Sequence, residues 1–361
     1  MKSLRFAFVC CRPKAAGFES GPSFIYRCQN LGLALEAAGH SVELAHYSKF
    51  NSMLAHNPPF DAIVFHRPRY SFGLRLTLRR LRKAGTLCVA DFDDMVFNPD
   101  WAPYSPGVVN QQVSLPQTRK NFSAHAKALK LFQHASVSTT PLVSDMQTSH
   151  NQTPWFIPNA VHLHWRDQVS THVQTQPQAS SPAPNKRVIT YFPGTRSHDR
   201  DFSMIKAPLQ QVLAEYPHAA LHITGELADD GILQGISAQQ LVRHPKQAFA
   251  DYRTHVARSQ INLAPLEQTE FNQRKSALKA IEASYFNAPT LASPIPDMQR
   301  LESAGAVLVE SNDSAWYDAL SHAIKAPASI LRSAILTHAD AHQIARDFLH
   351  QVHKARLAPH G

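Results

Sequence analysis

Two lysines, a glutamate and an asparagine in the segment Phe271–Pro296 have the residue types and the spacing of a binding site. Lys275, Lys279 and Glu282 are spaced i, i+4 and i+7, so on a helix with about 3.6 residues per turn they form one stripe, with Asn272 at its N-terminal end. The free N–H groups of a helix N-terminus and two ammonium groups favour a phosphate or diphosphate. Glu282 lies deeper in the helix and is suited to accept hydrogen bonds from a neutral diol such as a ribose.

A purely structural interpretation of the stripe stays open. An asparagine before a helix is a common N-cap, and a lysine–glutamate stripe is typical of a solvent-exposed helix face. Leu278, Ile281 and Tyr285 lie on the other side of the helix and would pack on a sheet in either case. A binding site requires the stripe to face a cleft between domains.

The segments that must position this helix follow the pattern of an α/β domain. Its strands are expected at Arg187–Phe192, Ala220–Thr224 and Ile261–Ala264. Gly194 and Thr195 come after the first of these strands and lead into a helix, an arrangement that brings backbone N–H groups close to a phosphate. His198 can donate to the same anion or can cap the helix. Gly225 and Glu226 follow the next strand and are further candidate contacts to a nucleotide.

The first half of the chain predicts a doubly wound parallel sheet. Its strands are expected at Leu4–Cys11, Ser41–His46, Asp61–His66 and Thr86–Ala90, with a helix at about Pro22–Ala38. No G-x-G-x-x-G motif follows the first strand, which argues against a nicotinamide or flavin enzyme.

Polar residues occupy the carboxyl ends of two of these strands, where ligands of open α/β sheets gather. His66 and Arg67 end one strand, and Asp91, Asp93 and Asp94 follow the next. We therefore expect them to line one edge of a crevice. Three carboxylates this close repel each other and require cations, sugar hydroxyl groups or an arginine nearby. A turn or N-cap role for one or two of the aspartates is an open alternative.

The composition predicts a globular protein of two domains with an anionic partner. The chain has 361 residues, of which 43% are apolar and 17% charged, and a formal charge of +9. We find no apolar run of transmembrane length and no signal-peptide pattern. The four cysteines have neither metal spacing nor the density of a disulfide framework, so we expect reduced thiols and a cytoplasmic protein.

The densest basic cluster is Arg75–Lys83, where five cationic residues are interleaved with leucines. A basic amphipathic helix of this kind suits the anionic inner face of a membrane. A surface helix whose leucines pack on the protein core is the alternative interpretation. The basic residues lack the interleaved aromatic residues of base-stacking surfaces, which argues against a nucleic-acid partner.

The order of these segments resembles the glycosyltransferase B fold, specifically the retaining group-1 superfamily that uses nucleotide-sugar donors. The donor-site signature of that superfamily is similar to INLAPLEQTEFNQRKSALKAIEASYFNAPTLASP in this chain. One branch has a Gly-Thr-x-x-His-x-x-Asp form, an Asp-x-Asp-Asp segment and a Pro-Asn turn, which resemble FPGTRSHDRDF, VADFDD and IPNAV. The resemblance covers nearly the whole chain.

The resemblance implies two Rossmann-like domains facing each other across a cleft. Residues 1–166 would form the acceptor domain, 167–186 a polar linker and 187–334 the domain for the donor nucleotide. Residues 335–361 would form a helix that returns to the first domain.

The resemblance also implies roles for single residues. Glu282 would accept the ribose hydroxyl groups of the donor, in agreement with the stripe. The residues implied near the diphosphate are Gly194, Thr195, His198, Asn272, Lys275, Ser276 and Lys279. The superfamily usually has another glutamate eight positions before the late one, but here that position holds Arg274, so that Glu267 or Glu270 would have to substitute.

The implied reaction transfers a sugar from a nucleoside-diphosphate sugar to a hydroxyl of a glycan or lipid-linked acceptor, with retention, in the synthesis of a surface glycan or polysaccharide. Lys275 and His198 would stabilise the leaving diphosphate, while Asp91, Asp93 and Asp94 would face the acceptor. No metal or other cofactor is expected. A nucleotide-sugar epimerase, a phosphorylase and an inactive partner subunit, the last suggested by Arg274, are alternatives on the same fold.

Overall fold

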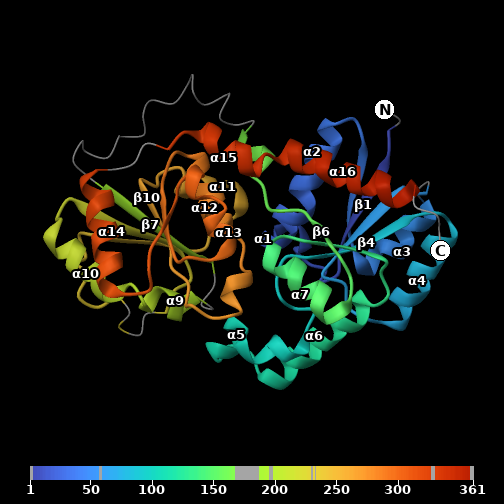
Figure 1. The fold of residues 1–361 in the computed structure, drawn as a ribbon, viewed down its shortest axis with the longest axis horizontal. Coiled ribbons are helices and arrows are strands. Elements are labelled where there is room, and N and C mark those ends of the chain that lie inside the picture. Colours follow the sequence, from blue (N-terminus) through green and yellow to red (C-terminus); the bar gives the residue numbers. More distant parts are fainter. Residues whose placement is uncertain are drawn as a thin grey trace.

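The protein is built from two parallel α/β domains that lie side by side (Figure 1). The computed structural model describes residues 3–56, 59–166, 187–194, 198–228, 231, 233–326 and 330–357. The predicted linker, residues 167–186, lies outside these described residues. Each domain has one six-stranded sheet in which neighbouring strands run parallel, which confirms the predicted fold class.

The sheet of the first domain has the strand order β2-β1-β3-β4-β5-β6. Its strands are β1 (Arg5–Cys10), β2 (Ser41–His46), β3 (Ala62–His66), β4 (Leu87–Phe92), β5 (His134–Val137) and β6 (Trp155–Phe156). Its helices are α1 (Pro22–Phe24), α2 (Asn30–Ala37), α3 (Tyr47–His56), α4 (Phe72–Lys83), α5 (Pro106–Val109), α6 (Leu115–Leu129) and α7 (Thr140–His150). A π-helical turn, Ile25–Gln29, connects α1 to α2.

The sheet of the second domain has the order β12-β11-β10-β7-β8-β9. Its strands are β7 (Arg187–Gly194), β8 (Ala219–Gly225), β9 (Leu241–His244), β10 (Ile261–Ala264), β11 (Thr290–Ala292) and β12 (Ala306–Leu308). The remaining helices are α9 (Asp199–Ser203), α10 (Lys206–Glu215), α11 (Phe249–Val256), α12 (Leu278–Tyr285), α13 (Pro296–Gln299), α14 (Asp313–Lys325), α15 (Arg332–Ala339) and α16 (Ala341–Leu357).

Helices cover both faces of the first sheet, so its central strands are buried on both sides, as is usual for parallel sheets. On one face, the leucines of α4 (Leu74, Leu78 and Leu81) pack in a core with Phe50 and Phe65. On the other face, α2 and α16 cover the sheet. The prediction that the leucines of the basic segment face the protein core is therefore correct for these three.

The C-terminal segment forms two helices, so the prediction of one helix starting at residue 335 is wrong. α15 packs on the second domain through Ile335, whereas α16 packs on the first domain. The chain bends at Asp340, whose carboxylate accepts hydrogen bonds from the N–H groups of His342 (2.7 Å) and Gln343 (3.1 Å). The same carboxylate pairs with Arg166 at 2.8 Å. Asp340 therefore caps α16 at the point where the chain crosses between the domains.

We expect Asp340→Ala to lower the free energy of unfolding by about 1 kcal/mol, because it removes the cap of α16. Urea unfolding monitored by circular dichroism measures this loss. Asp347→Ala, an exposed change within the same helix, is the matched control and should cost less. Equal losses in the two variants would show that Asp340 does not act as the cap.

Candidate active site

Two adjoining cavities lie between the domains. The first, which we call the aromatic cavity, has a volume of about 200 Å³ and includes Phe249 and Tyr252 in its walls. The second, the polar cavity, has a volume of about 340 Å³ and includes Asp93 and Lys275. Lys279 lines both and marks their junction.

The helix that carries the predicted stripe is shorter than expected. The residues before α12 form a 3-10 turn (Asn272–Arg274) followed by Lys275 in extended conformation (φ −68°, ψ 150°). The side chain of Asp297 accepts a hydrogen bond from the N–H of Ala277 at 2.7 Å, which holds the chain where α12 begins. The later two members of the stripe lie on α12 and Lys275 lies in the loop before it, so the prediction of one continuous helix is wrong.

Lys279 is a cation deep in the cleft that forms no ion pair within the described part of the chain. Its Nζ atom lies 5.0 Å from the centre of the Tyr191 ring. Burial lowers the pKa of Lys279 from 10.5 to about 8, although Asp201 and Glu282 act in the opposite direction. Its ammonium group is therefore available to an anion that enters either cavity.

Both carboxylate oxygens of Glu282 accept hydrogen bonds from tyrosine hydroxyl groups. Tyr252 of α11 donates to one oxygen at 2.8 Å, and Tyr26 of the first domain donates to the other. Burial raises the pKa of Glu282 from 4.5 to about 7, against the lowering effect of both hydroxyl groups and of Lys279. The carboxylate borders the aromatic cavity, where it can accept a diol once the Tyr26 hydroxyl moves aside.

His198 lines the polar cavity and is oriented by Asp201. Its Nδ1 atom lies 2.7 Å from the Asp201 carboxylate, which also accepts a hydrogen bond from the Asn272 amide at 3.3 Å. Burial lowers the pKa of His198, so the ring is neutral at neutral pH, with its proton on Nδ1. Donation from Nε2 to an anion thus requires proton uptake on binding. Asn272 is buried and lines neither cavity. Its contact with Asp201 supports the pair of His198 and Asp201.

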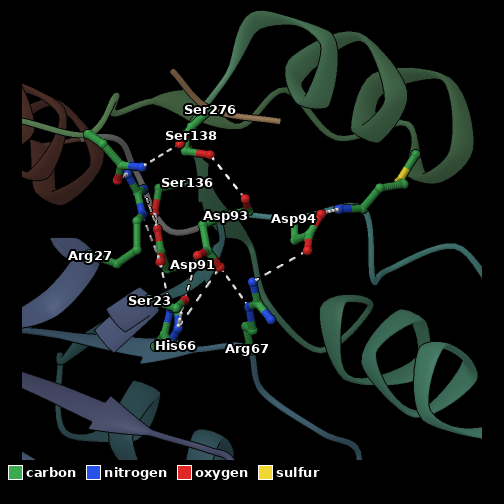
Figure 2. A network of polar contacts seen from close by, with 12 residues as sticks. Ser23, Arg27, His66, Arg67, Asp91, Asp93, Asp94, Ser136, Ser138 and Ser276 are labelled. Atoms are coloured by element: carbon green, nitrogen blue, oxygen red, sulfur yellow. Dashed lines mark hydrogen bonds and ion pairs between the residues drawn. The ribbon is translucent and has the colours of Figure 1, made fainter. Parts of the chain in front are cut away.

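Asp91 organises the polar residues of the first domain (Figure 2). Arg27 binds its carboxylate through two nitrogens at 2.6 and 3.2 Å. His66 contacts it through Nδ1 at 2.9 Å, and Ser136 donates to it at 2.8 Å. These contacts occupy both oxygens of a buried side chain, so Asp91 positions its neighbours. It does not line the polar cavity, and the prediction that it faces the crevice is wrong.

Ser23, His66 and Asp91 have the spacing of a nucleophilic triad, but their hydrogen bonds exclude that function. Ser23 Oγ lies 2.8 Å from Nε2 of His66 and donates its proton to Asp93 at 2.5 Å. Nε2 therefore faces an oxygen that accepts, and Nδ1 faces a carboxylate. The Ser23 hydroxyl therefore directs its proton to Asp93 and not to His66, so His66 is not placed to activate it.

Two further aspartates, Asp93 and Asp94, face the polar cavity and pair with cations. Arg67 donates to Asp93 at 2.6 Å. Despite burial, Arg67 and His66 hold the pKa of Asp93 well below its usual value. The Asp94 carboxylate lies 3.3 Å from Nζ of Lys275 and 3.8 Å from Arg67. The Lys275 contact joins the two domains across the cleft.

The predicted site residues fall into three groups. Those that line a cavity are Asp93, Asp94, Gly194, His198, Gly225, Lys275, Ser276, Lys279 and Glu282. Glu226 is exposed outside both cavities, and Asn272 is buried beneath them. Thr195 lies outside the described residues.

The glycines Gly194 and Gly225 let two strand ends approach each other at the aromatic cavity. Gly225 has φ 130°, and a Cβ atom on it would lie 3.1 Å from the backbone nitrogen of Gly194. Only glycine fits this conformation and spacing.

Arg274, which departs from the superfamily pattern, faces away from both cavities. It pairs with Asp145 of the first domain at 2.8 Å and with Glu270 at 2.6 Å. Its guanidinium also lies 4.3 Å from the centre of the Trp101 ring. Glu267 pairs with Arg200. Neither glutamate lines a cavity, so neither takes the place of the missing carboxylate.

Four site residues are absent from the sequence prediction: Ser23, Tyr26, Arg27 and Tyr252. They come from the first helical segment and from α11, and no spacing in the sequence relates them to Glu282 or Asp91. Within the described ranges, no three His, Cys, Asp or Glu side chains are grouped so as to hold a metal ion.

The fold is that of known nucleotide-sugar enzymes with the glycosyltransferase B fold. The chain is similar to a UDP-forming α,α-trehalose-phosphate synthase from Burkholderia vietnamiensis (TM-score 0.61, 12% identity, 97% of this chain and 100% of that one). It is also similar to a UDP-GlcNAc 2-epimerase from Neisseria meningitidis bound to UDP-GlcNAc (TM-score 0.52, 12% identity, 97% and 100%). No family model and no curated protein matches the sequence.

We expect Glu282→Gln to raise the melting temperature above pH 7 and to leave it nearly unchanged below pH 4.5. The folded pKa of about 7 lies above the unfolded value of 4.5, so stability falls as the pH rises between them, and the full cost of the buried charge is present above pH 7. The uncharged amide avoids that cost. Glu302→Gln, at an exposed position, is the control. An equal rise in melting temperature above pH 7 and below pH 4.5 would contradict the raised pKa of Glu282.

Proposed function

We propose that the protein is a glycosyltransferase that moves a sugar from a nucleoside-diphosphate sugar to an acceptor hydroxyl. One observation carries this proposal: Lys279, a cation without an ion pair among the described residues, lies where the aromatic cavity meets the polar cavity. A nucleotide sugar consists of a nucleoside, a diphosphate and a sugar in that order, which matches the order of the aromatic cavity, Lys279 and the polar cavity. The diphosphate would then lie on Lys279.

The aromatic cavity suits the nucleoside. Phe192 and Phe249 offer ring surfaces to a base, and Glu282 offers acceptor oxygens to a ribose. The ribose hydroxyl groups would replace the hydroxyl of Tyr26 on Glu282. One hydrogen bond to the carboxylate is exchanged for another, so the exchange costs little free energy.

The polar cavity suits the sugar and the acceptor hydroxyl. Its carboxylates are Asp93 and Asp94, and its cations include Arg67, Lys275 and Lys279. In the proposed reaction the acceptor oxygen bonds to the anomeric carbon and the bond from that carbon to the phosphate oxygen breaks. The hydroxyl proton passes to the leaving phosphate, and the anomeric configuration is retained. Lys279, the polarised N–H groups at the start of α12 and a protonated His198 would stabilise the charge of the leaving group, with no metal or other cofactor in the proposal.

A nucleotide-sugar epimerase is a second candidate, since such an enzyme is among the similar structures. Incubation with a panel of nucleotide sugars, followed by proton NMR, separates the possibilities. A transferase requires an acceptor, here proposed to be a glycan or lipid-linked glycan of surface-polysaccharide synthesis. An epimerase changes the donor alone. Donor binding without turnover would indicate an inactive partner subunit.

We expect Lys279→Ala to lower kcat by about 10²–10³, the usual effect of removing one group that stabilises transition-state charge. Lys275→Ala should lower kcat less, because its ammonium already pairs with Asp94 at 3.3 Å. Initial rates of nucleoside-diphosphate release measure both. A larger loss of kcat in Lys275→Ala than in Lys279→Ala would show that Lys275, and not Lys279, is the main group that stabilises the leaving diphosphate.

Binding of UDP should have a bell-shaped pH dependence with its maximum between pH 7 and 8. As the pH falls below about 7, Glu282 takes up a proton and accepts more weakly, and as it rises above about 8, Lys279 loses its charge. Calorimetric titration at several pH values measures this. Lys279→Arg keeps its charge throughout this range and should remove the alkaline decline. A profile without the acid decline would contradict the assignment to Glu282, and a profile without the alkaline decline would contradict the assignment to Lys279.

A further inference from the structure

Helix α4 exposes apolar and cationic side chains on one surface. Phe72 is 68% exposed and Leu76 is 50% exposed, and Tyr70 just before the helix is 41% exposed. The cationic side chains exposed around them are Arg75, Arg79, Arg80, Arg82 and Lys83. The leucines on the opposite face pack in the core, so α4 is fixed to the domain and its outer surface is free.

The charges of α4 are not arranged to stabilise the helix itself. Cations near the C-terminus favour the helix dipole, but Arg75 lies near the N-terminus, where a positive charge is unfavourable. Arg75 and Arg79, and also Arg79 and Lys83, are like charges at i, i+4 and repel each other. No aspartate or glutamate occurs between residues 67 and 90 to compensate them. An external anionic partner would offset this repulsion.

The basic surface continues onto the C-terminal end of α16, which lies at the same end of the molecule as α4 (Figure 1). A cavity of about 520 Å³ connects them and is lined by Arg82, Lys83 and Arg356, of which Arg356 pairs with Asp61. Lys354 is exposed beside it, and Leu357 is 84% exposed. The surface thus combines cations with exposed apolar side chains on two helices.

We propose that α4 and the C-terminal end of α16 form a docking surface for an anionic lipid bilayer. The phosphate groups of the lipids neutralise the arginines and lysines, and Phe72 and Leu76 insert between the acyl chains. A nucleic acid would match the charge but would leave the two apolar side chains uncovered. None of the described helices is long and apolar enough to cross a membrane, so the protein would bind at the surface.

The docked orientation also indicates a class of acceptor, an inference that rests on the proposed function. α4 begins at the carboxyl edge of the sheet, beside a cavity of about 270 Å³ that is lined by Arg12, Arg69 and Tyr70. Arg67, two residues before Arg69, lines the polar cavity. Both cavities lie at the same edge of the sheet, so a headgroup in the docked bilayer would approach the edge where Asp93 lies, which suits an acceptor carried by a lipid.

Co-sedimentation with vesicles tests the docking surface without reference to activity. The full chain should bind vesicles of phosphatidylcholine with phosphatidylglycerol, release at high salt, and not bind phosphatidylcholine alone. Arg79→Glu with Arg80→Glu should weaken binding about tenfold or more. Phe72→Ser with Leu76→Ser should weaken it as well, since both apolar side chains insert.

Matched controls are the exposed pair Arg119→Glu with Lys120→Glu on α6, and Leu331→Ser, which replaces a side chain that is 69% exposed. These controls should bind vesicles like the unchanged protein. Equal vesicle binding by the α4 variants and the controls would overturn the proposal. So would tighter binding to a duplex oligonucleotide that the Phe72 and Leu76 changes leave unaffected. UDP-induced thermal shift, which the α4 variants should retain, shows that they are folded and reports separately on the proposed function.

Discussion

The candidate site depends on two opposite charges that helix α12 holds in the cleft without pairing them to each other. Lys279 and Glu282 are three residues apart, yet burial shifts the pKa of each toward its neutral form, the amine of Lys279 and the carboxylic acid of Glu282. Hydroxyl groups rather than a cation satisfy the carboxylate. Two buried charges with incomplete compensation destabilise a fold. Such residues are typical of functional sites, where a ligand supplies the missing interaction.

The contacts between the domains involve the same side chains that would bind ligands. Tyr26 donates to Glu282, Lys275 pairs with Asp94, and the Asn159 amide donates to Ser276 at 3.0 Å. A ligand in the cleft must therefore exchange its own polar groups for these contacts. Since each exchange replaces one hydrogen bond or ion pair by another, affinity would come mainly from apolar contact and from the diphosphate on Lys279.

Local periodicity in the sequence was sufficient to predict β1 to β4, β7, β8 and β10 and the stripe residues Lys279 and Glu282, but it did not predict β9. It was not sufficient for features that depend on distant partners. Lys275 leaves the helix because Asp297, far along the chain, holds Ala277, and the last helix breaks because Asp340 meets Arg166. The tyrosines on Glu282 come from other elements, one of them in the other domain, and no spacing relates them to it. Resemblance identified the fold, but the pairing of Arg274 could be seen only in three dimensions.

The cations of this basic protein differ in what neutralises them. In the first domain Arg27 and Arg67 are each held by an aspartate at a fixed distance, so they organise the cavity wall and add little net charge. The exposed arginines of α4 have no acidic residue near them in the sequence, so no neighbouring carboxylate along the chain neutralises their charge. Lys279 belongs to neither group, because it lies inside the cleft and yet has no carboxylate partner among the described residues. The compensated cations shape the cavity wall, whereas Lys279 and the α4 arginines are the positions at which we propose that anionic ligands bind.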